Sequence, residues 1–400
     1  MRILQLSNKV PYPTKDGGAI ASMNLIKGFS HLRHEVTVLS MSTVKHRITV
    51  DELPESVSDL ADFRFVDVPA RISAIKALSN LLFSSLPYNA ARFINIDFSK
   101  ALSKLLEEKE FDVIQLEGLY VCPYIPLIRR KSKAMIVYRA HNVEFEIWER
   151  TAKMSKGLLK FYLKNLARRI KKFELSVLNT YDLLVPITER DNSILNKLGN
   201  KQPSQVSQTG IDSSVLVPNA RNLEYPSVFH IGSMEWSPNQ EGLLWFVQNC
   251  WPALNKKYPD LKFYVAGRGT PEWLEKKLKQ SNVEFLGEVE DAYNFMNSKA
   301  VMVVPLFSGS GMRIKIIEGM ALGKSIVSSP IGAEGIEIEP GKHLLIAETP
   351  SEFVNAISNL VEDKNMFTKL GENAIGFIHE KFDNLATAGK LIDFYKQHQQ

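Results

Sequence analysis

The stretch Val301–Ser328, VMVVPLFSGSGMRIKIIEGMALGKSIVS, decides the fold of this chain. It contains an apolar strand, a turn rich in glycine and serine, a helical pattern and a second apolar strand. Short runs that are apolar throughout indicate strands of a parallel sheet whose two faces are covered by helices. The stretch therefore predicts a β–α–β unit, in which the turn Ser308–Gly311 joins the carboxyl end of a strand to a helix N-terminus.

The same alternation extends along nearly the whole chain, which is typical of an α/β protein. In the first half, strands are predicted at Ile3–Ser7, Glu35–Ser40, Phe63–Val68, Asp112–Leu116, Met135–Tyr138 and Leu183–Ile187. In the second half, they are predicted at Val228–Ile231, Lys262–Val265, Val283–Leu286, Val301–Val304, Ser325–Ser328 and His343–Ile346. Each set is enough for one doubly wound sheet, so we expect two Rossmann-like domains facing across a cleft.

Residues 217–226 interrupt both patterns, because Pro218 and its polar neighbours favour neither helix nor strand. A chain of 400 residues also exceeds the usual size of a single domain. We therefore expect an N-terminal domain at residues 1–220 and a C-terminal domain at 221–383. A helix is predicted at residues 384–400, and periodicity leaves open whether it packs back on the first domain.

The composition is that of an ordinary globular protein, with 44% hydrophobic and 23% charged residues. No window approaches the roughly 18 consecutive apolar residues that a membrane-spanning helix needs. The N-terminal residues have the character of a buried strand rather than of a secretion signal. Cys122 and Cys250 lie far apart and at no metal-binding spacing, so we expect buried thiols and a cytoplasmic protein.

The segment Lys153–Lys172 carries eight Lys and Arg residues among leucine and aromatic positions. This pattern predicts a basic amphipathic helix that can bind an anionic membrane surface. The protein would then be peripheral on the inner face of the cytoplasmic membrane. A solvated helix face without a partner is an equal alternative. We expect no nucleic-acid partner.

The turn Ser308–Gly311 has the features of an anion site. Backbone N–H groups and the helix dipole favour a negative charge at a helix N-terminus, and glycine permits its close approach. Arg313 and Lys315 place cations where the dipole alone opposes them, which an anionic ligand would explain. Glu318 follows on the Lys315 face and suits the two hydroxyls of a ribose. The alternative is a glycine loop before a salt-bridged surface helix, without a ligand.

The run Gly309–Lys324, GSGMRIKIIEGMALGK, resembles the C-terminal signature of retaining glycosyltransferases of the GT-B fold, family 4, also called group 1 glycosyltransferases. In that family, two Glu residues separated by seven others line the donor site. The second, which holds the nucleotide ribose, matches Glu318. The first, which meets the sugar hydroxyls, falls on Ser310, so the donor sugar is left undetermined. The resemblance implies a donor-binding site that also includes Gly232, Gly311 and Met312.

The resemblance extends over most of the chain. Ser7–Pro13 leads to Gly17 and Gly18, similar to the family's glycine loop, which meets the donor when the domains close. Many members carry an Arg and a Lys for the diphosphate shortly after the glycine that matches Gly232, whereas this chain has Ser233 and polar residues. We therefore expect Arg313 and Lys315 to supply this charge as catalytic residues. The C-terminal domain would bind the nucleotide-sugar, and the N-terminal domain the acceptor.

A polar cluster, Ala140–Glu144, follows the strand that ends at Tyr138, at the edge that faces the expected cleft. The matching histidine in similar enzymes approaches the donor sugar and its β-phosphate, which implies that His141 donates a hydrogen bond in the transition state. Asn142 and Glu144 would shape the acceptor side, with Glu117 as a further candidate. The alternative is a purely structural histidine.

The sequence contains no Asp-x-Asp motif and no cluster at metal-ligand spacing, so we expect no metal and no cofactor. The resemblance implies transfer of a hexose-type sugar, with retention, from a nucleotide-sugar to a glycan or lipid-linked acceptor in cell-surface polysaccharide or glycolipid synthesis. Two alternatives stay open. One is a nucleotide-sugar epimerase with the same two-domain architecture, and the other is a catalytically silent nucleotide-sugar-binding module.

Overall fold

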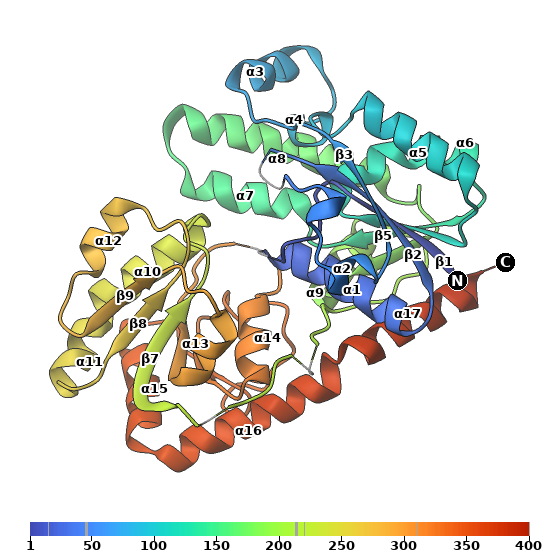
Figure 1. Ribbon diagram of the computed structural model, residues 1–400. Helices are drawn as coiled ribbons and strands as arrows, with labels where there is room; N and C mark the ends of the chain where they lie inside the picture. The colour runs from blue at the N-terminus through green and yellow to red at the C-terminus, as the bar shows by residue number, and fades with distance from the viewer. Residues whose placement is uncertain (15, 45–46, 213–214, 220, 310, 400) are drawn as a thin grey trace. The chain divides into compact units, whose positions relative to one another are not determined.

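The computed structural model describes residues 1–14, 16–44, 47–212, 215–219, 221–309 and 311–399, and Figure 1 shows the course of the chain. The chain divides into two compact units, residues 1–210 with 384–400, and residues 211–383. Within the described residues, each unit contains one sheet of six strands. All the strand pairs are parallel.

The sheet of the first unit has the order β3-β2-β1-β4-β5-β6, which is that of a doubly wound Rossmann-like fold. Its strands are β1 (Arg2–Ser7), β2 (Glu35–Ser42), β3 (Asp62–Asp67), β4 (Val113–Glu117), β5 (Met135–Ala140) and β6 (Leu183–Pro186). Its helices are α1 (Gly17–His31), α2 (Glu55–Ser58), α3 (Ala74–Phe83), α4 (Tyr88–Ala91), α5 (Ile96–Glu108), α6 (Ile125–Lys131), α7 (Glu144–Met154), α8 (Gly157–Val177), α9 (Glu189–Lys197) and α17 (Asn384–His398), with short 3-10 helices at Val50–Glu52 and Leu119–Tyr124.

The sheet of the second unit, ordered β12-β11-β10-β7-β8-β9, repeats this topology. Its strands are β7 (Glu224–Ile231), β8 (Phe263–Ala266), β9 (Val283–Gly287), β10 (Lys299–Val304), β11 (Ser325–Ser328) and β12 (Leu345–Ile346). Its helices are α10 (Ser237–Asn249), α11 (Trp251–Lys257), α12 (Glu272–Leu278), α13 (Ala292–Ser298), α14 (Ile314–Ala321), α15 (Pro350–Glu362) and α16 (Lys364–Lys381). Every predicted strand overlaps one of the twelve observed strands, which confirms the α/β class and the two Rossmann-like domains. The predicted cleft stays a prediction.

Except for the edge strand β3, the strands of the first sheet are buried on both faces. Alternate residues belong to different cores because side chains alternate along a strand. Ile3 packs in the core that contains α1 and α17, whereas Leu4 packs in the core that contains α5, α6 and α8. Cys122 and Cys250 are free and buried, as predicted. Among the helices that the structure describes, none combines the length and the apolar character needed to cross a membrane.

The chain divides at Gly210 and Ile211, ten residues before the boundary expected at residue 220. Residues after this point pack with the second unit, because Ile211 and Leu216 lie in one of its cores. The Ile211 N–H also donates a hydrogen bond of 2.8 Å to Phe382 O. The irregular segment that suggested the boundary is therefore already part of the second unit.

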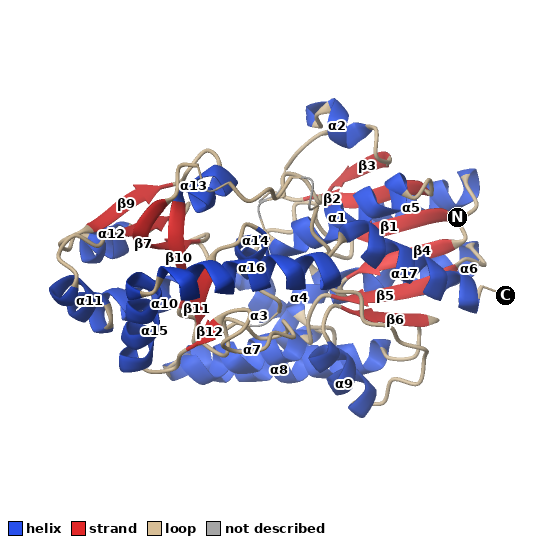
Figure 2. Cartoon of the chain, turned by 90° about the horizontal axis from the view of Figure 1, so that it is seen from below, coloured by secondary structure: helices blue, strands red, loops and turns tan. Residues whose placement is uncertain are grey.

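Helix α17 belongs to the first unit, where its apolar positions Ala388, Leu391, Ile392 and Tyr395 are buried. It crosses α1 closely, because a Cβ at Gly28 would lie 2.6 Å from Ala388 Cβ. Figure 2 shows α17 running along the first sheet beside α1. Helix α17 thus packs in the same core as the first strand, β1.

The basic segment Lys153–Lys172 does not form one helix, so this prediction was wrong. Helix α7 ends at Met154, and α8 begins at Gly157, whose φ of 60° is outside the range of an ordinary helix. The two helices pack against each other, and Leu163 and Ile170 of α8 are buried. The basic side chains lie mainly on the solvent side of this helical hairpin.

Candidate functional sites

The turn between β10 and α14 contains two glycines that adopt the left-handed conformation, Gly309 (φ 105°) and Gly311 (φ 81°). A Cβ at Gly309 would also lie only 2.6 Å from the Trp236 ring, so this position requires glycine. Arg313 has non-helical backbone angles and precedes the first helical residue, so it belongs to the turn. Ser310 lies outside the described residues.

Lys315 crosses from α14 to the end of β7. Its Nζ donates hydrogen bonds to Ile231 O at 3.1 Å and to Asn239 Oδ1 at 2.9 Å. A Cβ at Gly232 would lie 3.1 Å from Lys315 Nζ, so the glycine leaves room for the ammonium group. Burial, and secondarily the nearby Arg313 charge, lowers the pKa of Lys315 to about 7.

Arg313 is held at the base of the turn. Its guanidinium lies 5.1 Å from the centre of the Trp236 ring, and its Nη1 donates to Gly311 O. A cation stacked on an aromatic face in a buried place is held firmly. Arg313 and Lys315 thus bring two positive charges to the N-terminus of α14, where the helix dipole adds to them. An anion would be stabilised at this point.

Glu318 lies one turn further along α14 than Lys315 and is partly exposed. It accepts a hydrogen bond of 3.0 Å from the Tyr293 hydroxyl of α13. Burial raises the pKa of Glu318, and this hydrogen bond opposes the rise. Met312 is partly exposed beside them and packs against the same core. The structure therefore brings together Gly232, Gly311, Met312, Arg313, Lys315 and Glu318 in the second unit.

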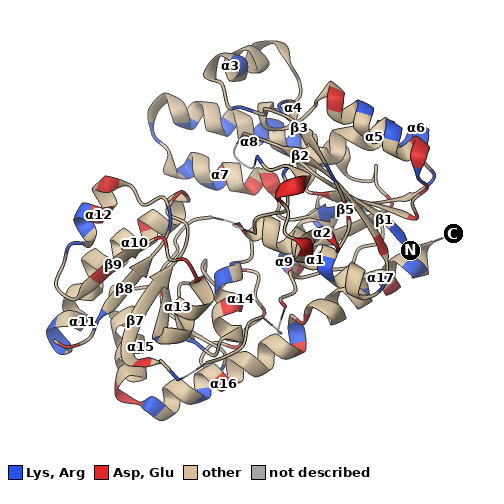
Figure 3. Ribbon diagram, viewed as in Figure 1, with Lys and Arg blue, Asp and Glu red and all other residues tan. Residues whose placement is uncertain are grey.

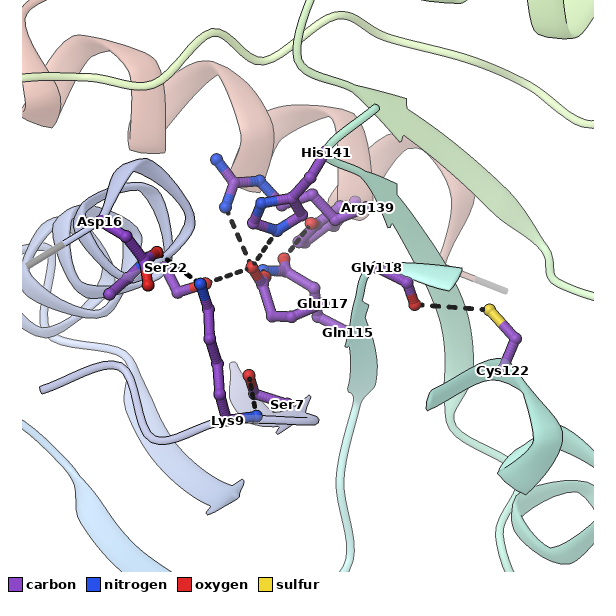
Figure 4. Close-up of polar contacts among 12 residues, drawn as sticks. Ser7, Lys9, Asp16, Ser22, Gln115, Glu117, Gly118, Cys122, Arg139 and His141 are labelled. Atoms are coloured by element: carbon purple, nitrogen blue, oxygen red, sulfur yellow. Dashed lines mark hydrogen bonds and ion pairs between the residues drawn. The ribbon is translucent and has the colours of Figure 1, made fainter. Parts of the chain in front are cut away.

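The predicted residues of the first unit centre on Glu117, at the end of β4 (Figure 4). Its Oε2 accepts hydrogen bonds from Ser22 Oγ at 2.6 Å, Arg139 Nη1 at 3.1 Å and His141 Nε2 at 2.7 Å. Its Oε1 accepts one from the Gln115 amide, which in turn receives a 2.6 Å hydrogen bond from the Tyr395 hydroxyl. Glu117 is buried and orients the His141 ring through this hydrogen bond. Its expected place on the acceptor side stays a prediction.

Glu117 is a carboxylate that stays ionised. Burial alone would raise its pKa, but the Arg139 charge and the hydrogen bonds from His141 and Ser22 hold the pKa well below its usual range. Burial lowers the pKa of His141 despite the Glu117 charge. An ionised carboxylate only accepts hydrogen bonds, so the neutral imidazole carries its proton on Nε2. Its Nδ1 is then an acceptor, opposite to the donor role expected from the sequence.

Asn142 and Glu144 follow His141 at the start of α7. Glu144 accepts a hydrogen bond of 2.8 Å from the Tyr120 hydroxyl, and burial raises its pKa although Tyr120 and Asn142 oppose the rise. Both residues are partly exposed. They lie in the same chain turn as His141 and can present polar groups to a ligand.

Gly17 and Gly18 begin α1, after the N-cap residue Asp16. Lys9 forms an ion pair with Asp16, and a Cβ at Gly18 would lie 2.8 Å from Lys9 Nζ. The glycine therefore makes room for the lysine. The positive charge of Lys9 acts on both His141 and Glu144, which places it with the polar group of the first unit.

Sequence reasoning missed the supporting residues Lys9, Ser22, Arg139 and Tyr293. Arg139 offered a signal, because a charged residue inside the apolar strand Met135–Ala140 must meet a partner. Ser22 and Tyr293 offered none, because their partners are 95 and 25 residues away. The described residues contain no group of three or more His, Cys, Asp or Glu that could hold a metal ion, and metal independence stays a prediction.

Comparison with known proteins finds a matching family for most of the second unit. Residues 225–363 match the family model described as "Glycosyl transferases group 1". An uncharacterized 44.6 kDa protein in the cps region of Klebsiella pneumoniae is 22% identical over 397 residues, covering 96% of this chain and 97% of that protein. The phosphatidyl-myo-inositol mannosyltransferase of Mycolicibacterium smegmatis is 31% identical over 151 residues, covering 36% and 39%.

Two solved structures have the same fold along nearly the whole chain. Sucrose-phosphate synthase from Thermosynechococcus elongatus has a TM-score of 0.75 at 15% identity, covering 99% of both chains. HepE from Anabaena, in complex with UDP and glucose, has a TM-score of 0.70 at 14% identity, again covering 99% of both.

The likeness to these structures shows the class of fold, which is the two-domain GT-B fold. More particularly, residues 225–363 of the second unit match the model of the group 1 glycosyltransferases. Membership of family 4 stays a prediction.

Proposed function

We propose that the chain transfers a hexose-type sugar, with retention, from a nucleoside-diphosphate sugar to a glycan or lipid-linked acceptor in the synthesis of a cell-surface polysaccharide or glycolipid. The proposal includes neither a metal nor a cofactor. The observation that carries it is the grouping of Lys315, Arg313 and Glu318 around the N-terminus of α14. The UDP and glucose complex of HepE, a protein of the same fold, is a further support.

The second unit would hold the nucleotide. Two described acceptors engage two of the three protons of the Lys315 ammonium, so a third is available for a diphosphate oxygen. The Arg313 charge and the dipole of α14 would stabilise the negative charge that develops on the leaving diphosphate. Glu318, fixed by Tyr293, would accept hydrogen bonds from the ribose hydroxyls.

The first unit would bind the acceptor and one side of the sugar. His141 Nδ1 would accept a hydrogen bond from a sugar hydroxyl, because Glu117 holds the proton on Nε2. Asn142 and Glu144 would contact the acceptor from the start of α7. The side chain of Glu117 already accepts hydrogen bonds from Ser22, Arg139 and His141. We therefore assign no substrate contact to it.

The donor site is tested by titration calorimetry, after thermal-shift screening of UDP-, GDP-, ADP- and dTDP-sugars has identified a nucleotide. Arg313→Ala and Lys315→Ala should each weaken binding of the nucleoside diphosphate by about 1.5–3 kcal/mol, as expected for hydrogen bonds to charged groups. Lys277→Ala, at an exposed position of α12, is the matched control and should bind normally. Unchanged affinity in both site variants would refute the assignment.

The pH dependence of binding gives a sharper test of Lys315. With a pKa of about 7 in the free protein, this group is charged at pH 6 and mostly neutral at pH 8.5. A bound diphosphate favours the charged form, so affinity should fall as pH rises above 7, and binding near pH 8 should take up a proton. Lys315→Met should remove this dependence. A wild-type affinity that is flat from pH 6 to 9 would contradict the role.

The reaction itself separates transfer from its rivals. A transferase turns over donor only with an acceptor, or slowly with water. An epimerase would convert the sugar without any acceptor, and a silent module would bind the donor without consuming it. Analysis of the products by mass spectrometry, with and without added glycan and lipid-linked acceptors, distinguishes these outcomes. The anomeric configuration of the product tests retention.

A further inference from the structure

Helix α3 does not bury its apolar residues. None of its ten residues is buried, although an amphipathic helix in a globular protein normally covers its apolar side. Ile75 and Leu82 are exposed, and Phe83 at its end is 85% exposed. Ile72, just before the helix, is exposed as well. This segment carries large apolar side chains without a core to receive them.

The beginning of α8 has the same property. Leu158 is 89% exposed and Phe161 is 72% exposed, whereas Leu163 and Leu166, one turn further on, are buried. Leu158 and Phe161, near the start of α8, are therefore exposed to solvent, whereas the apolar residues further along the helix pack in the core. Solitary exposed leucines are common, but groups of large apolar side chains usually mark a contact surface.

The two segments are fixed to each other. Arg169 of α8 donates hydrogen bonds from Nη2 to Asn80 O at 3.1 Å and to Leu86 O at 2.8 Å, at the end of α3 and just after it. Leu158 precedes Arg169 by eleven residues, about three helical turns, so both lie on the same side of α8. Figures 1 and 2 both show α3 beside α8. We name Ile72, Ile75, Leu82, Phe83, Leu158 and Phe161 the α3–α8 surface.

The surroundings of the α3–α8 surface are strongly basic. Residues 71–87 and 151–172 contain ten Lys and Arg residues and no Asp or Glu. The whole chain has a net charge of only +5, so the remainder of the protein is net negative. Lys76, Lys153, Lys156 and Lys164 are exposed here, and Figure 3 shows the basic residues along α8.

We propose that the α3–α8 surface docks on an anionic lipid bilayer. Its apolar side chains would enter the headgroup region, and the surrounding lysines would bind lipid phosphates. A protein partner fits less well, because lysine is depleted at protein interfaces, whereas long lysine side chains extend readily from a membrane-embedded helix to the headgroups. The sequence pointed to the basic segment alone, and the structure adds α3 and its fixed position. The inference does not depend on the donor or on the reaction.

Flotation with vesicles tests the proposal directly. The protein should float with vesicles of equal parts phosphatidylglycerol and phosphatidylcholine, and much less with phosphatidylcholine alone. Lys153→Gln with Lys156→Gln and Lys164→Gln should lower the partition coefficient by about tenfold or more, as should Leu158→Ser with Phe161→Ser. The controls are Lys256→Gln with Lys277→Gln and Lys279→Gln, exposed lysines of the second unit, and Ile96→Ser, which replaces a side chain that is 68% exposed. Both should bind as the wild type does.

A labelling experiment locates the contact and does not need a binding-deficient variant. Cys122 and Cys250 are buried, so an environment-sensitive dye will react with a cysteine introduced at the surface. Dyes on F83C and F161C should shift their emission to the blue on anionic vesicles, while the dye on I96C should not. Equal shifts at all three positions would overturn the proposal.

Other outcomes also overturn it. These are a failure of the wild type to float with anionic vesicles, equal flotation with neutral and anionic vesicles, and equal losses in the control variants. Concentration-dependent dimers that L158S/F161S abolishes, without vesicle binding, would assign the surface to a second copy of the chain. None of these results bears on nucleotide binding, which is measured without lipid, so a failure here is distinguishable from a failure of the proposed transfer.

Discussion

At the scale of single residues, Glu117 is a buried charge that its hydrogen-bond partners stabilise and that orients His141 in turn. Its two oxygens receive hydrogen bonds from Ser22, Gln115, Arg139 and His141, which offset the loss of hydration on burial. The same contacts orient the His141 ring and determine which of its nitrogens carries the proton. Glu117 is therefore a positioning residue, and its removal should affect stability and the site together.

Glu117→Gln should lower the free energy of unfolding by about 3–5 kcal/mol, because it leaves the buried Arg139 guanidinium without a carboxylate. His141→Ala should lower it by less, about 1–2 kcal/mol, because His141 is partly exposed and uncharged. Urea unfolding of both variants measures the difference. The pair has a second readout, since both should slow transfer while leaving the affinity for the nucleoside diphosphate unchanged. Equal losses of stability in the two variants would show that Arg139 does not depend on Glu117.

The candidate residues of the second unit were predictable because most of them come from one stretch. Gly311, Arg313, Lys315 and Glu318 are fixed relative to one another by a turn and a helix, so their spacing in the sequence determines their spacing in space. The same logic fails for Tyr293 and Ser22, which meet their partners only through the folded sheet. It also fails for the position of the proton on the His141 ring, because this position is determined by Glu117 on a neighbouring strand.

At the scale of elements, one helix supplies the cap of another. The N-cap residue of α7, Val143, has no side chain that could accept a hydrogen bond. Instead, Glu174 of α8 accepts hydrogen bonds of 3.1 Å from the backbone N–H groups of Glu144 and Phe145. These are two of the donors that a helix N-terminus leaves without partners. The Glu174 carboxyl group thus ties the start of α7, next to His141, to α8.

Glu174 should make the stability of the protein depend on pH. Burial, and secondarily the Glu144 charge, raises the pKa of Glu174 to about 8. Between its unfolded value and pH 8, the native state binds more protons than the unfolded state, so this contribution to stability is lost as pH rises through 8. Glu174→Gln should remove it. The difference in unfolding free energy between variant and wild type should change by on the order of 2–4 kcal/mol between pH 5.5 and 9. Parallel stability curves for the two proteins would contradict the assignment.

The limits of sequence patterns are also visible among the elements. The strands were predicted well because a buried parallel strand is apolar at most of its positions. The break between α7 and α8 was missed, because one glycine inside a helical pattern is often tolerated. Nothing in the composition of residues 72–83 distinguishes an exposed apolar helix from a buried one, since burial depends on what the rest of the chain places against it.

At the scale of the whole molecule, the first unit is assembled from both ends of the chain. Helix α17 buries Ala388, Leu391, Ile392 and Tyr395 against α1 and the sheet. A chain that ends at Asp383 should therefore lose more than about 5 kcal/mol from the stability of the first unit, at roughly 1.5–3 kcal/mol for each large side chain. The second unit, residues 211–383, should still bind the nucleotide.

Hydrogen exchange measured by mass spectrometry can follow the two units separately in this truncated chain. Protection should fall in β1, β4 and α1 and persist in β7, β10 and α14. A chain that ends at His398 is the control, because it keeps the whole of α17. Full protection of the first unit without α17 would show that the helix is dispensable.

The hydrogen bond from Tyr395 to Gln115 also has a consequence for the order in which the protein is made. The ribosome completes residues 211–383 before it reaches α17, so the second unit can fold first although it comes later in the sequence. The polar network behind His141 therefore lacks Tyr395 until α17 has been translated. A nascent chain can thus complete its second unit, with the candidate nucleotide site, before α17 completes the first unit.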